Sequence, residues 1–179
     1  MKSLLTPAQV NLTIQRLAHQ IVENHLQLEN TVIIGLQPRG IFVSNRIVEA
    51  LKLIVPPENI NYGKLDITFY RDDIRSSLHI ANETDIPFSI ENKSVVLIDD
   101  VLWTGRTIRA ALDALLDYGR PAAVELCVLI DRRFSRQLPI QPNYIGRSID
   151  TYHSQQVKVY WQEKDGKNEV ALINQVNPE

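Results

Sequence analysis

Two adjacent carboxylates and a group of small polar residues lie close together between positions 99 and 107. Asp99 and Asp100 follow the apolar run Val95 to Ile98, and Thr104-Gly105-Arg106-Thr107 comes shortly after them. Carboxylates can accept hydrogen bonds from the vicinal hydroxyls of a sugar or hold Mg²⁺. Glycine lets the backbone approach a phosphate closely, and threonine hydroxyls can add hydrogen bonds. The stretch therefore predicts a site for a ribose 5-phosphate.

A strand and a helix must flank this stretch if its groups are to meet at one ligand. The run Val95 to Ile98 is typical of a central strand buried on both faces. Beyond the turn, Ile108, Ala111, Leu112 and Leu115 recur at helical spacing. A helix N-terminus binds phosphate through free N–H groups, and α/β sheets bind ligands at the carboxyl ends of their strands.

Two common nucleotide-binding patterns are absent from the sequence. It contains neither the P-loop pattern Gly-x-x-x-x-Gly-Lys nor the dinucleotide pattern Gly-x-Gly-x-x-Gly. The alternative to a ligand site is that the two aspartates form a solvated strand end and Thr104-Gly105 a plain helix cap.

The bulk properties favour a single cytoplasmic domain spanning residues 1–179. The chain has 179 residues, a formal net charge of −2 and one cysteine. The slight negative charge gives no general attraction to nucleic acid or membrane, so RNA binding would need a local basic patch. One cysteine excludes a disulfide within the chain. The sequence shows no signal peptide and no apolar run long enough for a membrane span.

Alternation of strand and helix patterns predicts an α/β fold with a mostly parallel twisted sheet and antiparallel strands at the end. Thr6-Pro7 is typical of a helix start. The expected strands are 31–36, 64–70, 124–130, 143–146, 157–161 and 170–173, with a hairpin turn at Asp165-Gly166, and a helix is expected over 41–53.

A second anion site is expected in the loop Gln37-Pro38-Arg39-Gly40, between a strand and a helix. Backbone N–H groups and a guanidinium can bind an anion there. Arg71 and the polar stretch that runs to about Glu83 could form a lid that excludes water from a reaction. A simple turn and an ordinary surface loop are the alternatives.

The stretch from Val95 to Thr107 resembles the phosphoribosyl pyrophosphate (PRPP) motif of type I phosphoribosyltransferases. The closer resemblance is to the PyrR family of pyrimidine operon regulators, which also act as uracil phosphoribosyltransferases. Further segments follow the family's order over nearly the whole chain: Gly35 to Arg46, Asp66 to Asp73, Gly119-Arg120-Pro121, and Leu138 to Gly146.

This resemblance implies a type I phosphoribosyltransferase fold with a flexible lid, and conversion of uracil and PRPP to UMP and pyrophosphate. Asp99, Asp100 and Arg71 are the expected catalytic residues, and Mg²⁺ would be held mainly through PRPP. The expected binding residues for PRPP and UMP are Pro38, Arg39, Gly40, Arg71, Asp99, Asp100, Val101, Leu102, Trp103, Thr104, Gly105, Arg106, Thr107, Arg132 and Val157.

The nature of the base depends on position 103. Purine enzymes typically place a proton-transferring Asp just before Thr-Gly, and Trp103 cannot transfer a proton. In the family, uracil is recognised largely by backbone groups near the positions of Arg132 and Val157. A purine-type phosphoribosyltransferase and a regulator that senses PRPP or nucleotides without catalysis are the alternatives.

The resemblance also implies UMP- or UTP-dependent binding of pyrimidine operon leader RNA, which controls transcription attenuation. The matching positions are Arg16, His19, Arg136 and Arg147. Pro38, Gln15 and Gln141 depart from the family's common residues, and the segment from Asp131 to Arg136 is one residue longer. Homodimers or homotetramers are expected.

Overall fold

The predicted central strand lies in the middle of a parallel sheet of five strands, in the order β3-β2-β4-β5-β6. The computed structural model describes residues 1–71, 82–152 and 154–174. The strands are β2 (Thr31–Leu36), β3 (Asn61–Leu65), β4 (Ser94–Leu102), β5 (Ala123–Arg133) and β6 (Tyr144–Asp150). All four pairings are parallel. The carboxyl ends of the strands therefore meet at one edge of the sheet, where the predicted site begins.

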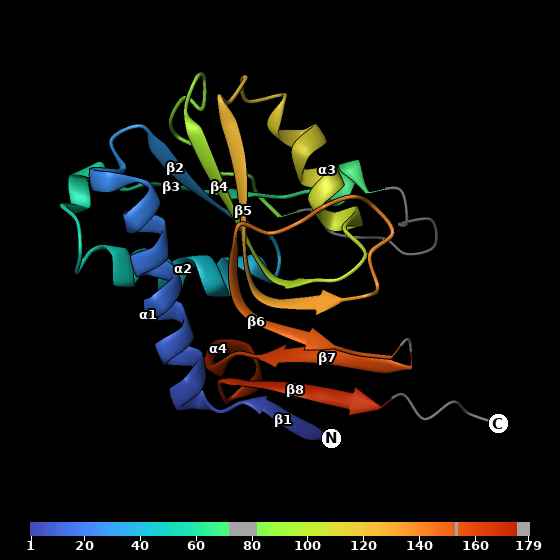
Figure 1. Ribbon diagram of the computed structural model, residues 1–179. Coiled ribbons are helices and arrows are strands. Elements are labelled where there is room, and N and C mark those ends of the chain that lie inside the picture. The colour runs from blue at the N-terminus through green and yellow to red at the C-terminus, as the bar shows by residue number, and fades with distance from the viewer. Residues whose placement is uncertain (72–81, 153, 175–179) are drawn as a thin grey trace.

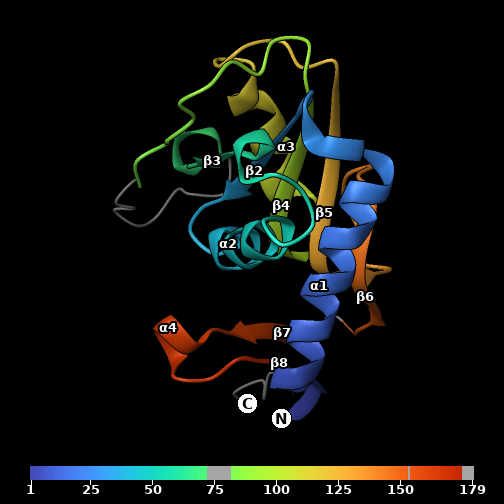
Figure 2. The same cartoon turned by 90° about the vertical axis from the view of Figure 1, so that its left-hand side faces the viewer.

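Helices cover both faces of this sheet (Figures 1 and 2). α1 (Pro7–Asn24) and α2 (Gly40–Leu51) share one core cluster with Val96 and Ile98 of β4. α3 (Arg106–Leu115) shares the other cluster with Val95 and Leu97. Because successive side chains of a strand point to opposite faces, the apolar run of β4 fills both cores.

The start of α1 confirms the cap expected from the sequence. The Thr6 hydroxyl accepts a hydrogen bond from the Gln9 N–H, the Gln9 side chain accepts one from the Thr6 N–H, and Pro7 begins the helix. This reciprocal capping box satisfies N–H groups that have no partner within the helix. Val10, Ile14, Leu17 and Ile21 form the buried stripe of α1.

The antiparallel strands form a separate small sheet in the order β1-β8-β7. Its members are β1 (Lys2–Leu5), β7 (Gln155–Tyr160) and β8 (Glu169–Asn174), with the short helix α4 (Gln162–Asp165) between the last two. Figure 1 shows this sheet below β6, with the N-terminus in it. Strand β1 was not expected from the sequence, because its four residues carry no clear alternation of apolar and polar side chains.

The strand expected over residues 64–70 is wrong in its position. Strand β3 ends at Leu65, and the 3-10 helix η3 (Thr68–Tyr70) follows. The Asp66 carboxylate causes the change, since it accepts hydrogen bonds from the N–H groups of Thr68 (2.6 Å) and Asn82 (2.7 Å) and so offers the backbone a turn. The other 3-10 helices are η1 (Leu26–Leu28) and η2 (Pro57–Asn59).

Two further expectations concern loops. Asp165 ends α4 and Gly166 is its left-handed cap with φ 73°, so β7 and β8 pair through a longer connection than a hairpin turn. Most of the expected lid, residues 72–81, lies outside the described residues. Among the residues that the structure describes, no helix has the length and apolar composition required to cross a bilayer.

Candidate functional site

A cavity of about 590 Å³ opens at the carboxyl ends of β4 and β5. Three regions of the main sheet form its floor and sides: the β2–α2 loop, the end of β4 with the turn into α3, and the end of β5. Strand β7 of the small sheet forms the remaining wall. The lining residues are Arg39, Arg71, Asp99 to Ile108, Arg132 and Gln155 to Val159.

The structure therefore brings together nearly all of the site residues expected from the sequence. Pro38 and Gly40 flank Arg39 but do not line the cavity. Gly40 begins α2, where a Cβ atom would lie 2.6 Å from the carbonyl oxygen of Ile98. The absence of a side chain lets α2 start directly against β4, which sets Arg39 at the cavity.

The two aspartates lie at the floor of the cavity and differ in their surroundings. Each is 7% exposed. The Asp99 carboxylate accepts the Asp100 N–H at 2.8 Å, whereas the Asp100 carboxylate forms an ion pair with Arg39 at 2.9 Å. Burial, and then the charge of Asp100, raise the pKa of Asp99 well above the ordinary range. A ligand that donates hydrogen bonds or positive charge to Asp99 would favour its ionisation.

The turn from Trp103 to Thr107, called the phosphate turn below, joins β4 to α3. Gly105 has φ 93°, a left-handed conformation that residues with side chains rarely adopt, and it caps the N-terminus of α3. The Thr104 hydroxyl accepts a hydrogen bond from the Arg106 N–H at 3.4 Å. The first N–H groups of α3 therefore lie at the cavity wall, where they can bind an anion.

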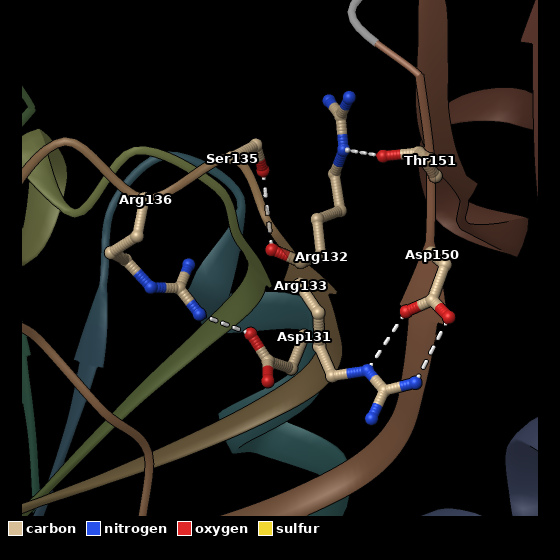
Figure 3. A network of polar contacts seen from close by, with 7 residues as sticks. All are labelled: Asp131, Arg132, Arg133, Ser135, Arg136, Asp150 and Thr151. Carbon is tan, nitrogen blue, oxygen red and sulfur yellow. Dashed lines mark hydrogen bonds and ion pairs between the residues drawn. The ribbon is translucent and has the colours of Figure 1, made fainter.

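Trp103 and Arg132 lie against each other in the cavity wall. Trp103 is 46% exposed, and the Arg132 guanidinium lies 4.8 Å from the centroid of its ring. Arg132 is buried and donates to the Thr151 hydroxyl at 3.0 Å (Figure 3). It also donates to the Gln155 carbonyl at 2.8 Å. These contacts fix both the guanidinium and the indole that it stacks on.

Strand β7 presents its free backbone edge to the cavity. Arg39 donates to the carbonyl of Val159, and Arg132 donates to that of Gln155. Since alternate residues of a strand point their backbone groups to the same edge, the N–H and C=O of Val157 face this edge as well. Val157 was expected from the sequence, whereas its neighbours in β7 were not, because a backbone contribution leaves no mark in side-chain type. The unexpected lining residues are Gln155, Gln156, Lys158 and Val159 of β7, and Ile108 of α3.

The four residues expected to bind RNA fall into two places. Arg16 donates to the Ile145 and Gly146 carbonyls of β6, and Arg147 donates to the Leu4 carbonyl of β1. His19 follows Arg16 on α1, with Nδ1 2.9 Å from the Gln15 carbonyl. Arg136 instead contacts Asp131 and the Trp103 carbonyl at the cavity.

Acidic groups near the cavity do not form a metal cage. Over residues 1–71, 82–152 and 154–174, no group of three or more His, Cys, Asp or Glu side chains is arranged to hold a metal ion. The donors at the cavity are the carboxylates of Asp99 and Asp100, and Arg39 already occupies one of them. Such a set fits a cation that the substrate carries in, which would take few ligands from the protein.

Comparison with known proteins identifies a family over nearly the whole chain. The phosphoribosyl transferase domain model matches residues 2–164. A protein from Picosynechococcus named "Bifunctional protein PyrR" is 45% identical, covering 95% of this chain and 96% of its own. The proteins of that name from Deinococcus deserti and Elusimicrobium minutum are 44% and 42% identical, and they cover 95% and 92% of this chain and 93% and 92% of their own lengths.

Solved structures with the same fold are more distant in sequence. A hypoxanthine phosphoribosyltransferase from Staphylococcus aureus superposes with a TM-score of 0.74 at 19% identity, covering 100% of this chain and 95% of its own. One from Trypanosoma cruzi has a TM-score of 0.71, also at 19% identity, and covers 97% of both chains. At this identity the likeness shows the fold alone.

Proposed function

The chain belongs to the PyrR family of phosphoribosyltransferases, and on that premise we propose that it transfers ribose 5-phosphate from PRPP to uracil, giving UMP and pyrophosphate. One observation carries the proposal. The acidic pair, the phosphate turn, Arg39 and Arg71, and an open strand edge line the same cavity. Each matches a different part of the two substrates.

In the transfer, the bond between C1′ of the ribose and the pyrophosphate oxygen breaks, a bond from C1′ to uracil N1 forms, and the N1 proton leaves. The sugar becomes cationic on the way. Asp99 and Asp100 would accept hydrogen bonds from the ribose hydroxyls and place negative charge near that cation. Residues 104–107 would hold the 5-phosphate, and Arg39 and Arg71 would bind the departing pyrophosphate. This chemistry requires no nucleophile from the protein.

Mg²⁺ is the expected cofactor. The acidic pair fits an ion that enters with PRPP, since oxygen ligands suit Mg²⁺ and few protein ligands are needed when the substrate supplies the rest. When bound, Mg²⁺ neutralises charge on the pyrophosphate as it departs. Asp99 and Asp100 are the side chains that would hold it, with Arg39 balancing the charge of Asp100.

The free edge of β7 supports uracil as the base. An adjacent N–H donor and C=O acceptor on Val157 match the alternating carbonyl and N–H groups of a pyrimidine imide. Arg132 and Trp103 line the same cavity as Val157. Trp103 offers no group for proton transfer to a purine ring, which argues against hypoxanthine and guanine as substrates.

Product formation from PRPP and Mg²⁺ with a panel of uracil, orotate, hypoxanthine and guanine tests this proposal. We expect UMP from uracil and no nucleotide from the purines. Replacing Asp99 or Asp100 with Asn should lower kcat/KM by about a hundredfold or more, since preorganised groups aimed at a developing charge are worth that much. Nucleotide formed only from a purine would overturn the assignment of uracil, and no product from any base would leave a nucleotide sensor.

The outer face of α1 and β6 supports a second function, regulation through pyrimidine operon leader RNA in the presence of UMP or UTP. Arg16 and Arg147 lie along edge strand β6, with His19 next to Arg16 on α1. Cationic side chains on an open face suit phosphate binding, which is salt-dependent. Replacing Arg16 or Arg147 with Ala should weaken RNA binding and reduce its salt slope by about one, while UMP formation stays unchanged.

The whole chain acts in this proposal as one cytoplasmic domain that assembles into homodimers or homotetramers. Pairing of β1 with β8 joins the first residues to the last strand, which supports one domain across residues 1–179. Size-exclusion chromatography with light scattering would distinguish the two assemblies, and a monomer at assay concentration would contradict both.

A further inference from the structure

The segment Arg136 to Leu138, called the brace below, lies beside the phosphate turn and holds its carbonyl groups. Arg136 donates from Nη1 to the carbonyl of Trp103. The backbone N–H groups of Gln137 and Leu138 both donate to the carbonyl of Thr104, at 3.0 and 3.2 Å. The Gln137 side chain accepts a hydrogen bond from Arg106 Nε at 2.8 Å. The three residues of the brace therefore contact Trp103, Thr104 and Arg106 of the turn.

These contacts fix the orientation of two peptide planes. In a trans peptide the C=O of one residue and the N–H of the next point in opposite directions. With the Trp103 and Thr104 carbonyls directed at the brace, the N–H groups of Thr104 and Gly105 must point to the opposite side. Both residues line the cavity, so the brace aims two donors at the place proposed for the 5-phosphate.

Arg136 is itself held in place by a buried carboxylate. Its Nη2 atom lies 2.5 Å from Oδ1 of Asp131. Asp131 is buried and is the third residue from the end of β5. Figure 3 shows the Arg136 guanidinium directed at Asp131, while Arg132 and Arg133 extend toward Thr151 and Asp150. A strand residue thus fixes the guanidinium, and the guanidinium fixes the turn.

We propose that Arg136, anchored by Asp131, is a positioning residue that orients the phosphate turn for binding the 5-phosphate of PRPP. The proposal rests on the proposed transfer function. It gives Arg136 a different role from the RNA contact that was expected from the sequence. A guanidinium that already binds a carboxylate and a carbonyl would have to leave both in order to bind an RNA phosphate.

Steady-state kinetics of Arg136→Ala provide the test. Without the guanidinium, the Trp103 peptide can rotate and the Thr104 N–H loses its fixed direction. Since a hydrogen bond to a charged group is worth enough to change affinity about tenfold or more, KM for PRPP should rise about tenfold or more. The phosphate does not react, so kcat should change much less than KM. A purely structural role would instead lower the active fraction, and with it kcat, at unchanged KM.

Arg133→Ala is the matched control. Arg133 lies three residues before Arg136 and forms a two-pronged ion pair with Asp150, in which both side chains are about half exposed. It contacts neither the brace nor the turn in any hydrogen bond that the structure records for it. KM for PRPP should equal that of the wild type in this variant. Arg136→Lys keeps one charged donor but cannot bridge both acceptors. Its KM for PRPP should therefore lie between those of the wild type and Arg136→Ala.

RNA binding gives the opposing outcome. If Arg136→Ala weakens binding of pyrimidine operon leader RNA and leaves KM for PRPP unchanged, Arg136 is an RNA ligand and the positioning role is wrong. Should Arg136→Ala fail to fold, Arg136→Lys decides, because a lysine can keep the ion pair with Asp131 but cannot also reach the Trp103 carbonyl, so its KM for PRPP should still exceed that of the wild type.

The proposed function and the positioning role fail in different ways. If the wild type forms no nucleotide from any base, the transfer function is wrong, and calorimetric titration with ribose 5-phosphate then tests the brace alone. Weaker binding of ribose 5-phosphate by Arg136→Ala than by Arg133→Ala would support the brace in that case. Equal affinities in the two variants would overturn it.

Discussion

At the scale of single residues, the buried Asp99 carboxylate destabilises the folded chain, and another residue would be expected here if the site did not need a carboxylate. It lies buried beside a second carboxylate, and Arg39 pairs with Asp100 rather than with Asp99. A charge in such a place is unfavourable unless a ligand compensates it. An expensive group retained at the floor of a cavity is typical of a functional site.

Asp99→Asn should therefore be more stable than the wild type at neutral pH. The folded-state pKa of Asp99 lies above the value of 3.8 for a free aspartate, so folding favours its protonated form. Stability from this group is complete below the unfolded pKa and is lost as the pH rises through the folded pKa. We expect the thermal midpoint of Asp99→Asn to exceed that of the wild type at pH 7.5, by roughly 2–4 °C for each kcal/mol. The difference should vanish as the pH approaches 3.8.

Asp100→Asn is the control for this prediction. It breaks the ion pair with Arg39, whose other contact is the Val159 carbonyl in the small sheet. It should lower the thermal midpoint or leave it unchanged. If Asp99→Asn is less stable than the wild type at pH 7.5, the carboxylate is compensated in a way that burial and the Asp100 charge do not describe.

At the scale of elements, a polar cluster at the amino end of the sheet joins α1 to two strands. Glu125 of β5 lies 2.8 Å from Nε2 of His25, at the end of α1, and accepts a hydrogen bond from the Tyr144 hydroxyl of β6 at 2.6 Å. Asn24 donates to the same hydroxyl at 3.1 Å. Burial raises the pKa of Glu125, but the hydrogen bonds from His25 and Tyr144 lower it by more, so its net shift is downward.

Glu125→Gln should lower the free energy of unfolding by about 1 kcal/mol at neutral pH, because a charge-assisted pair becomes a neutral one. A depressed carboxyl pKa contributes stability that is present above the unfolded pKa, near 4.5, and is lost as the pH falls through the folded pKa. Urea unfolding should thus show a difference in the free energy of unfolding between the wild type and Glu125→Gln at pH 7, and this difference should become smaller at pH 3.5. Glu23 lies on the exposed face of α1, so Glu23→Gln should have the same free energy of unfolding as the wild type at either pH.

Elements with one strong pattern were predictable from the sequence, and elements that depend on a distant partner were not. The capping box and stripe of α1 and the apolar run of β4 are local signals, and the structure confirms them. Strand β1 exists because β8 pairs with it, and β3 ends early because Asp66 binds the backbone of Asn82. Those causes lie in residues far along the chain, where a local pattern contains no information about them.

The candidate site divides in the same way. The contiguous stretch Asp99 to Thr107 was identifiable because carboxylates, hydroxyls and glycine each suit a part of ribose 5-phosphate. The wall formed by β7 was hardly predictable from the sequence, since it contributes backbone groups to the cavity. Arg136 was assigned to an RNA face by its basic side chain, while its contacts with Asp131 and Trp103 depend on how β5 ends.

At the scale of the whole molecule, the two sheets meet over the cavity through two arginines. Arg39 comes from the β2–α2 loop and Arg132 from β5, and each donates to a carbonyl on the free edge of β7. The small sheet is therefore held to the large one at the wall where the base is proposed to bind. A ligand that spans the phosphate turn and β7 would add contacts to both sheets, and its binding should stabilise the whole fold.

UMP should raise the thermal midpoint more than IMP does at the same concentration. A ligand that binds only the folded state at a hundred times its Kd adds about 2.7 kcal/mol, which corresponds to roughly 5–10 °C for a chain of this size. Arg132→Gln loses the guanidinium that joins β5 to Gln155 and stacks on Trp103, so its shift with UMP should be smaller. Differential scanning fluorimetry with UMP, IMP and ribose 5-phosphate measures the three shifts. Equal shifts with all three would mean that only the phosphate turn binds them, and that β7 plays no part in selecting the base.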